Sequence, residues 1–193
     1  MIDLDSQATD LLSNASRLLS EQGPHALTVR RIAAAAGWST MGVYSRFGSK
    51  NGVIDALYRE GIERMQEDLV AARLHGAAVD KVRQTLVAYR DNAVAHPCHY
   101  QLVFGGVLPD FEPIPETREI TSVVFADFVH AVTTAMNDGE LRRGDAGDVA
   151  YSLWALCHGL VTLEISAPAG VRKDDLGRRY ACALDIMLSG AAH

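Results

Sequence analysis

Apolar residues recur at intervals of three and four along most of the chain, and this spacing restricts the fold more than any other feature. Such intervals place side chains on one face of an α-helix, whereas a half-buried strand needs strict alternation, which no segment shows convincingly. Glycine or proline follows most of the periodic segments. The predicted helices span residues 8–19, 28–36, 40–47, 49–75, 79–95, 99–104, 116–137, 148–165 and 173–188. The chain of 193 residues is therefore predicted to be all-α, with about nine helices.

The predicted helices divide the chain into two domains. Three short helices near the N-terminus form a small unit over residues 1–52. The helix over about 49–75 links this unit to the rest of the chain, where the apolar faces become larger. Residues 53–193 are therefore expected to form a second domain, a helical bundle.

Composition excludes several classes of protein. Apolar residues make up 48% and charged residues 22%, which argues against general disorder, and the net charge of -6 excludes a wholly basic surface. The three cysteines show no short pairing pattern, so a disulfide framework is not expected. The acidic start is unlike a secretory signal, and the uncharged apolar run 149–163 is shorter than the ~20 residues that cross a bilayer. We expect a soluble cytoplasmic protein with no membrane partner.

One segment, residues 28–50, is basic and contains no acidic residue. Its basic residues are Arg30, Arg31, Arg46 and Lys50. Two short helices meet here at Gly37, a residue that tolerates the left-handed turn conformation, and Ala33 is small enough for the helices to cross closely. This is the outline of a helix-turn-helix, whose second helix enters the DNA major groove. An ordinary helical hairpin with a solvated basic face fits the same pattern.

The segment from Leu27 to Lys50 resembles the DNA-binding signature of TetR-family transcriptional regulators. Its sequence is LTVRRIAAAAGWSTMGVYSRFGSK, and the matching elements are Thr28, Ile32-Ala33, Ala36-Gly37, Ser39, Val43-Tyr44, Phe47 and Lys50. Further on, Trp154 and His158-Gly159 resemble the Trp…His-Gly type of C-terminal domain found in part of that family. The resemblance implies a homodimer that represses transcription by binding a palindromic double-stranded DNA operator. It also implies release of that operator when a small molecule enters the C-terminal, ligand-binding and dimerisation domain.

By position, the resemblance implies which residues contact the DNA groove or its phosphates. These are Arg30, Thr40, Met41, Gly42, Tyr44, Ser45, Arg46 and Lys50. Met41 and Gly42 have little hydrogen-bonding capacity, so the direct contacts with bases are expected from Thr40, Ser45 and Arg46.

Two positions depart from the family pattern. Trp38 stands where a smaller aliphatic residue is usual, and it is expected either to cover the helical hairpin or to contact the DNA backbone. Asn51-Gly52 replaces the usual acidic, helix-forming pair, so the first turn after Lys50 is expected to be looser.

The last two helices are predicted to form the dimer interface. Apolar side chains nearly encircle the helix 148–165, so it needs a partner on more than one face. Together with the helix 173–188 it is expected to build a four-helix arrangement across a two-fold axis. The candidate contacts are Tyr151, Leu160, Tyr180, Leu184 and Met187. The alternative is a large core within one chain.

A small apolar or amphipathic effector is expected to bind within the bundle, in a mostly apolar site with a few polar groups. The candidate lining residues are Met65, Leu69, Tyr89, Tyr100, Phe104, Phe125, Phe128, Val129, Trp154 and His158. Each of them also fits a plain core position.

No metal, cofactor or catalytic residue is predicted. His96-Pro97-Cys98-His99 is spaced too tightly for a usual structural zinc site. The sequence lacks a nucleophile motif, a phosphate-binding glycine loop and obvious paired carboxylates, so the protein is not expected to be an enzyme. The alternatives are a helical-bundle enzyme that uses His158 and a nearby carboxylate, or a small-molecule binding module without a DNA function.

Overall fold

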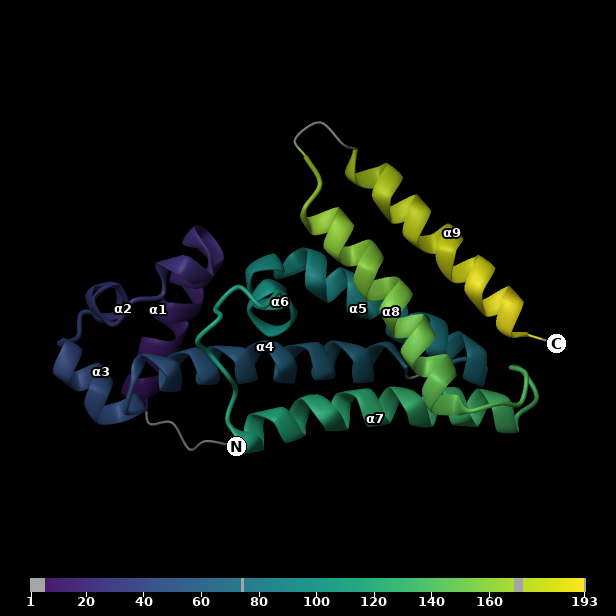
Figure 1. The fold of residues 1–193 in the computed structure, drawn as a ribbon, viewed down its shortest axis with the longest axis horizontal. Coiled ribbons are helices and arrows are strands. Elements are labelled where there is room, and N and C mark those ends of the chain that lie inside the picture. Colours follow the sequence, from purple (N-terminus) through teal and green to yellow (C-terminus); the bar gives the residue numbers. More distant parts are fainter. Residues whose placement is uncertain (1–5, 74, 169–171, 193) are drawn as a thin grey trace. The chain divides into compact units, whose positions relative to one another are not determined.

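The computed structural model describes residues 6–73, 75–168 and 172–192, and the regular structure in these ranges is helical (Figure 1). The elements are α1 (Ser6–Gln22), the 3-10 turn η1 (Pro24–Ala26), α2 (Val29–Ala36), α3 (Thr40–Phe47), α4 (Lys50–Ala72), α5 (Ala78–Ala95), α6 (Pro97–Phe104), α7 (Pro115–Asn137), α8 (Ala146–Ile165) and α9 (Lys173–Ala191). The predicted all-α class with about nine helices is confirmed. None of the helices in the described ranges combines the length and apolar character that crossing a bilayer requires.

Hydroxyl and carboxylate side chains fix where several helices begin. Thr28 Oγ1 accepts a hydrogen bond from the Arg31 N–H at 3.4 Å, and Ser39 Oγ accepts one from the Gly42 N–H at 3.0 Å. Asp145 Oδ1 accepts from the N–H of Asp148 at 3.0 Å, so α8 begins at Ala146, two residues before the predicted start. Each cap satisfies a backbone donor that the helix leaves unpaired, an effect of about 1 kcal/mol.

The chain forms two compact units. The first contains the described part of residues 1–64 together with 96–120, and the second contains 65–95 with the described part of 121–193. The helices α4 and α7 each contribute residues to both units. Residues 96–120 thus group with the N-terminal helices. The boundary near residue 52 between a DNA-binding domain and a ligand-binding domain stays a prediction.

The core of the first unit holds α2 and α3 in place. Leu11 and Leu19 of α1, Ile32 of α2, Val43 of α3 and Leu57 of α4 are fully buried. Burial of a leucine or isoleucine side chain contributes about 2 kcal/mol, so one apolar cluster fixes all four helices. The face of α3 opposite Val43 is left for other contacts.

A buried carboxylate fastens the start of α7 to α4 within the first unit. Asp55 is 5% exposed, and its carboxylate accepts from the Ile114 N–H at 2.9 Å and from the Thr117 hydroxyl at 2.8 Å. Tyr58, one turn along α4, packs against Phe111 with ring centroids 6.1 Å apart. The segment that precedes α7 is therefore held at both ends by α4.

A second polar group lies between α1, α4 and α6 of the first unit. Ser16 Oγ lies 3.1 Å from His99 Nε2 and 3.3 Å from Glu60 Oε1, and Arg64 pairs with the same Glu60 oxygen. His99 is 3% exposed. Burial lowers the pKa of His99 to about 4, and the positive charge of Arg64 and the nearby His96 add to the effect. The imidazole is therefore neutral at pH 7.

Acidification is expected to destabilise the first unit through His99. The unfolded chain protonates this histidine near pH 6.5, whereas the folded chain does so only near pH 4. The free energy of unfolding should therefore fall by up to about 1.4 kcal/mol per pH unit between these two values, as urea denaturation at pH 7 and pH 5 would measure. His99→Gln should lose this dependence. An NMR titration that finds His99 protonated in the folded protein at pH 6 would contradict the assignment.

A partly buried ion pair joins helices of the second unit. The Arg90 guanidinium of α5 donates to both carboxylate oxygens of Glu164 on α8, at 2.8 and 2.6 Å, and lies 5.7 Å above the Tyr180 ring of α9. The hydrogen bond to Glu164 raises the pKa of Arg90. The Tyr180 hydroxyl donates to the carbonyl oxygen of Leu86 at 2.6 Å. These contacts join α5, α8 and α9.

Candidate nucleic-acid interface

The helix α3 presents most of its polar and basic side chains away from the core. Val43 is fully buried and Phe47 half-buried on one face. The opposite side carries the exposed residues Thr40, Met41, Tyr44, Ser45 and Arg46. Met41 and Tyr44 are 74% and 47% exposed. A helix about as wide as the major groove, with one free face of this kind, has the shape of a recognition helix.

Basic side chains flank α3 within the first unit. Arg30 on α2 and Lys50 at the start of α4 are both exposed. No acidic residue occurs between Glu21 and Asp55, so this part of the surface attracts anions. Of the eight residues that the resemblance assigned to DNA, the structure leaves seven exposed and Gly42 half-buried, all in one unit.

Trp38 packs against α3 beside Gly42. A Cβ atom added to Gly42 would lie 3.1 Å from Cε3 of the half-buried indole, closer than an ordinary van der Waals contact. Of the two roles expected for Trp38, covering the helical hairpin is therefore observed. Gly42 leaves the space that the indole ring fills, a pairing that sequence spacing did not indicate.

The turn between α3 and α4 depends on Gly52. A Cβ atom there would overlap the carbonyl oxygen of Phe47 and lie 3.0 Å from its carbonyl carbon. Gly48 in the same turn has a φ of 70°, and the hydroxyl of Ser49 accepts from the Gly52 N–H at 3.0 Å. The first turn of α4 is thus capped and helical rather than loose, which corrects the expectation from the sequence.

The candidate effector residues fall into two groups. Tyr100 and Phe104 belong to the first unit, where their ring centroids are 5.1 Å apart, and the other eight belong to the second. In the second unit the Tyr89 hydroxyl lies 3.1 Å from His158 Nδ1, and the Trp154 and His158 rings are 5.2 Å apart. Burial lowers the pKa of His158. Phe125 packs edge-on against Trp154, so this group is an aromatic cluster with a polar centre.

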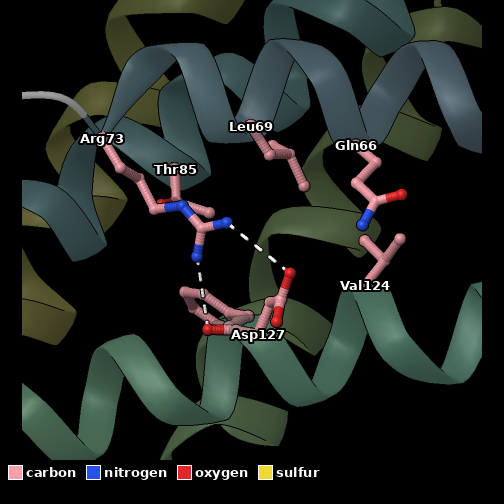
Figure 2. Close-up of a pocket in the computed structure, with 7 residues that line it drawn as sticks. Gln66, Leu69, Arg73, Thr85, Val124 and Asp127 are labelled. Carbon is pink, nitrogen blue, oxygen red and sulfur yellow. Dashed lines mark hydrogen bonds and ion pairs between the residues drawn. The ribbon is translucent and has the colours of Figure 1, made fainter.

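A small cavity in the second unit brings polar groups together with two of the predicted residues, Leu69 and Phe128 (Figure 2). Arg73, just after α4, donates to the backbone carbonyl of Asp127 on α7 at 3.2 Å and lies 4.0 Å from its carboxylate. The remaining lining residues are Gln66, Thr85 and Val124. The volume is about 10 Å³, which is the space of one water molecule. The sequence prediction included none of the polar residues that line this cavity. Asp127, an acidic residue on the otherwise apolar face of α7, could have indicated the site.

The predicted dimer contacts differ in exposure. Tyr180 and Leu184 are 3% and 0% exposed, so their side chains pack within their own unit and do not form an exposed surface for a second copy. Tyr151 is 59% exposed, while Leu160 and Met187 are half-buried. Met187 lines an open groove of about 360 Å³ between α8 and α9. Within the described residues, no group of His, Cys, Asp and Glu side chains is arranged to hold a metal ion.

Comparison with models of known protein families shows which family the chain belongs to. Residues 11–57 match the bacterial regulatory proteins of the tetR family, and residues 82–187, more than half of the chain, match the tetracyclin repressor-like C-terminal domain. The chain belongs to the TetR family. It is therefore a transcriptional regulator with an N-terminal helix-turn-helix DNA-binding domain, as the resemblance implied.

Several solved structures share its fold, among them that of a TetR-family transcriptional regulator. PfmR from Thermus thermophilus is 16% identical, with a TM-score of 0.73 over 95% of this chain and 99% of its own. The ketosteroid transcriptional regulator KstR2 of Mycobacterium tuberculosis is 20% identical, with a TM-score of 0.66 over 99% and 97%. A protein of unknown function from Rhodococcus sp. RHA1 is 26% identical, with a TM-score of 0.84 over 100% and 98%. No curated protein matches the chain.

Proposed function

We propose that this TetR-family regulator is a cytoplasmic, homodimeric repressor that binds a palindromic operator and releases it on binding a small effector. The observation that carries the proposal is the exposed, acid-free surface formed by α3 with Arg30 and Lys50. Regulation then proceeds through binding alone and uses no catalytic residue.

The side chains of this surface fit two kinds of DNA contact. Thr40, Ser45 and Arg46 carry hydrogen-bonding groups on the exposed part of α3, where base edges in the major groove would lie. Tyr44 offers both a ring and a hydroxyl. Arg30 lies on α2 and Lys50 at the start of α4, and both would contact phosphates on either side of the groove. Phosphate contacts position the protein, and base contacts give the sequence preference.

A second copy of the chain would dock on the outer face of α8. Tyr151, Ala155, Gly159 and Leu163 follow one another at intervals of four, and all four are exposed. A Cβ atom at Gly159 would have no neighbour within 4 Å among the described residues, so packing within one chain does not require a glycine at this position. The four positions are symmetric about residue 157. Antiparallel copies of α8 would therefore place each Ala155 against Gly159 and each Tyr151 against Leu163 of the other copy.

The effector would bind a wider form of the cavity beside Arg73. A volume of about 10 Å³ admits a water molecule but no organic compound, so a ligand binds only when the helices that line the cavity separate. A ligand with that preference shifts the protein toward the wider form. If the wider form fits the operator less well, ligand and operator oppose each other, and a coupling of about 1.4 kcal/mol reduces operator affinity tenfold. The apolar and charged lining favours an amphipathic effector.

The operator is found by selecting bound fragments from the genome of origin, with the region upstream of the protein's own gene included. The expected product is an inverted repeat whose half-sites lie about 34–36 Å apart, one DNA turn. Arg46→Ala and Tyr44→Ala should weaken binding while the dimer persists. Arg143→Ala removes the same charge from an exposed site in the second unit and should have little effect. Recovery of fragments that share no repeat would contradict the proposal.

A further inference from the structure

Met41 is the most exposed large apolar side chain in the described residues. It is 74% exposed, above Leu163 at 68% and Ile186 at 67%. It lies in the first turn of α3, two residues before the buried Val43, on the side of the helix that points away from the core. An exposed apolar side chain is not unusual by itself, but this one lies on the exposed face of the second helix of the helix-turn-helix, where it is open to contact with a partner.

The surroundings of Met41 identify that partner as duplex DNA rather than a protein or a membrane. Ser45, one turn along the same face, is also exposed. The exposed basic residues Arg30, Arg46 and Lys50 belong to a stretch of sequence that contains no acidic residue between Glu21 and Asp55. This charge pattern complements phosphates. Residues near the N-terminus of a recognition helix are those that contact base edges, and Met41 is the second residue of α3.

The chemistry of the side chain selects one feature of the groove. A thioether has no donor and is only a weak acceptor, so Met41 cannot recognise the polar edges of guanine, adenine or cytosine. The apolar group that B-DNA presents in the major groove is the C5 methyl of thymine. Methionine is flexible and polarizable, which suits contact with a methyl group. Gly42, whose near side is filled by Trp38, adds no side chain that would hold the helix away from the bases.

We propose that Met41 recognises the 5-methyl group of a pyrimidine, supplied by thymine, at one position in each operator half-site. The inference rests on the proposed function and extends it from a surface that binds DNA to one determinant of sequence preference. It adds an apolar contact to the polar contacts of Thr40, Ser45 and Arg46.

The test removes methyl groups from the selected operator one position at a time. Each thymine is replaced by deoxyuridine, which changes only the C5 methyl, and binding of the full-length protein is measured at fixed salt. At one symmetric position, replacement in a single half-site should weaken binding about fourfold, because one buried methyl contact is lost. Replacement in both half-sites should weaken binding about fifteenfold. Met41→Ala should bind the thymine and deoxyuridine operators equally at that position. Met41→Leu, which remains apolar, should still distinguish them.

A second arm separates thymine from methylated cytosine as the source of the methyl group. Each cytosine of the native operator is replaced by 5-methylcytosine in turn. None of these replacements should produce a gain in binding that depends on Met41. A Met41-dependent gain there would overturn the assignment to thymine. Equal loss on deoxyuridine replacement in the wild type and Met41→Ala would assign the methyl contact to another residue, and no loss at any thymine would also overturn the inference. Both of these results leave operator binding intact, whereas failure to bind any selected duplex would refute the proposed function itself.

Discussion

Gly52→Ala is expected to destabilise the first unit by about 3 kcal/mol and to abolish specific operator binding. The added Cβ would overlap the Phe47 carbonyl oxygen, a backbone atom that cannot rotate away, so the turn between α3 and α4 must change. Since α3 carries the exposed surface, its displacement removes the DNA contacts. Urea denaturation followed by Trp38 fluorescence in a Trp154→Phe background would report on the first unit, because the other tryptophan lies in the second.

The matched control is Gly144→Ala. A Cβ at Gly144 has no neighbour within 4 Å, so this variant should fold and bind as the wild type does. The packing account of Gly52 would be wrong if both alanine variants showed the same unfolding midpoint and operator affinity.

Gly159→Glu is expected to convert the dimer into a monomer and to lower operator affinity by about 100-fold or more. In the proposed dimer, each copy would bring a carboxylate close to the crossing point of the two α8 helices, where burial of two like charges would be unfavourable. A monomer engages one half-site and loses the contacts of the other. The side chain has open space within its own unit, so folding should be retained. Sedimentation velocity measures the oligomeric state, and circular dichroism confirms that the helices remain.

Ala126→Glu provides the comparison for this variant, because it adds the same carboxylate to an exposed position on α7. It should remain dimeric. A Gly159→Glu protein that sediments as a dimer and binds the operator normally would show that the interface lies elsewhere.

The sequence predicted the helix boundaries well where local chemistry sets them. Thr28 and Ser39 begin α2 and α3 because their hydroxyl groups pair with backbone donors three residues on, and Gly37 ends α2 with a φ of 69°. These effects act within a few residues, so spacing alone reveals them. The helix α8 begins two residues before its predicted start because the Asp145 carboxylate caps it.

Contacts that depend on packing were not predicted. The sequence marked Trp38 and Gly52 as unusual, but it did not indicate that Trp38 lies against Gly42 or that Gly52 lies close to the Phe47 carbonyl, because these contacts depend on the conformation of the turns that lead into α3 and α4. Apolar residues surround α8 in sequence, which concealed that its outer face carries the small Ala155 and Gly159. The resemblance implied a dimer, and periodicity indicated the helix face of Tyr180 and Leu184, but periodicity does not distinguish a face that meets its own unit from one that meets a partner.

The cavity residues Arg73 and Asp127 illustrate the same limit. They are 54 positions apart, Arg73 just after α4 and Asp127 on α7, and neither belongs to a recognisable motif. The apolar pattern located Leu69 and Phe128 on the correct helix faces but could not indicate which polar side chains reach the space between them.

The salt dependence of operator binding tests the central claim most directly. If the surface around α3 contacts phosphates, the logarithm of the association constant should fall steeply and linearly with the logarithm of salt concentration. Arg30→Ala and Lys50→Ala should each make the slope less steep by about one for every phosphate that the side chain neutralises. In a symmetric dimer, where both copies lose one phosphate contact, the change is about two. Arg143→Ala should leave the slope unchanged. A slope that is close to zero in the wild type, or that neither variant alters, would contradict the assignment of this surface to DNA.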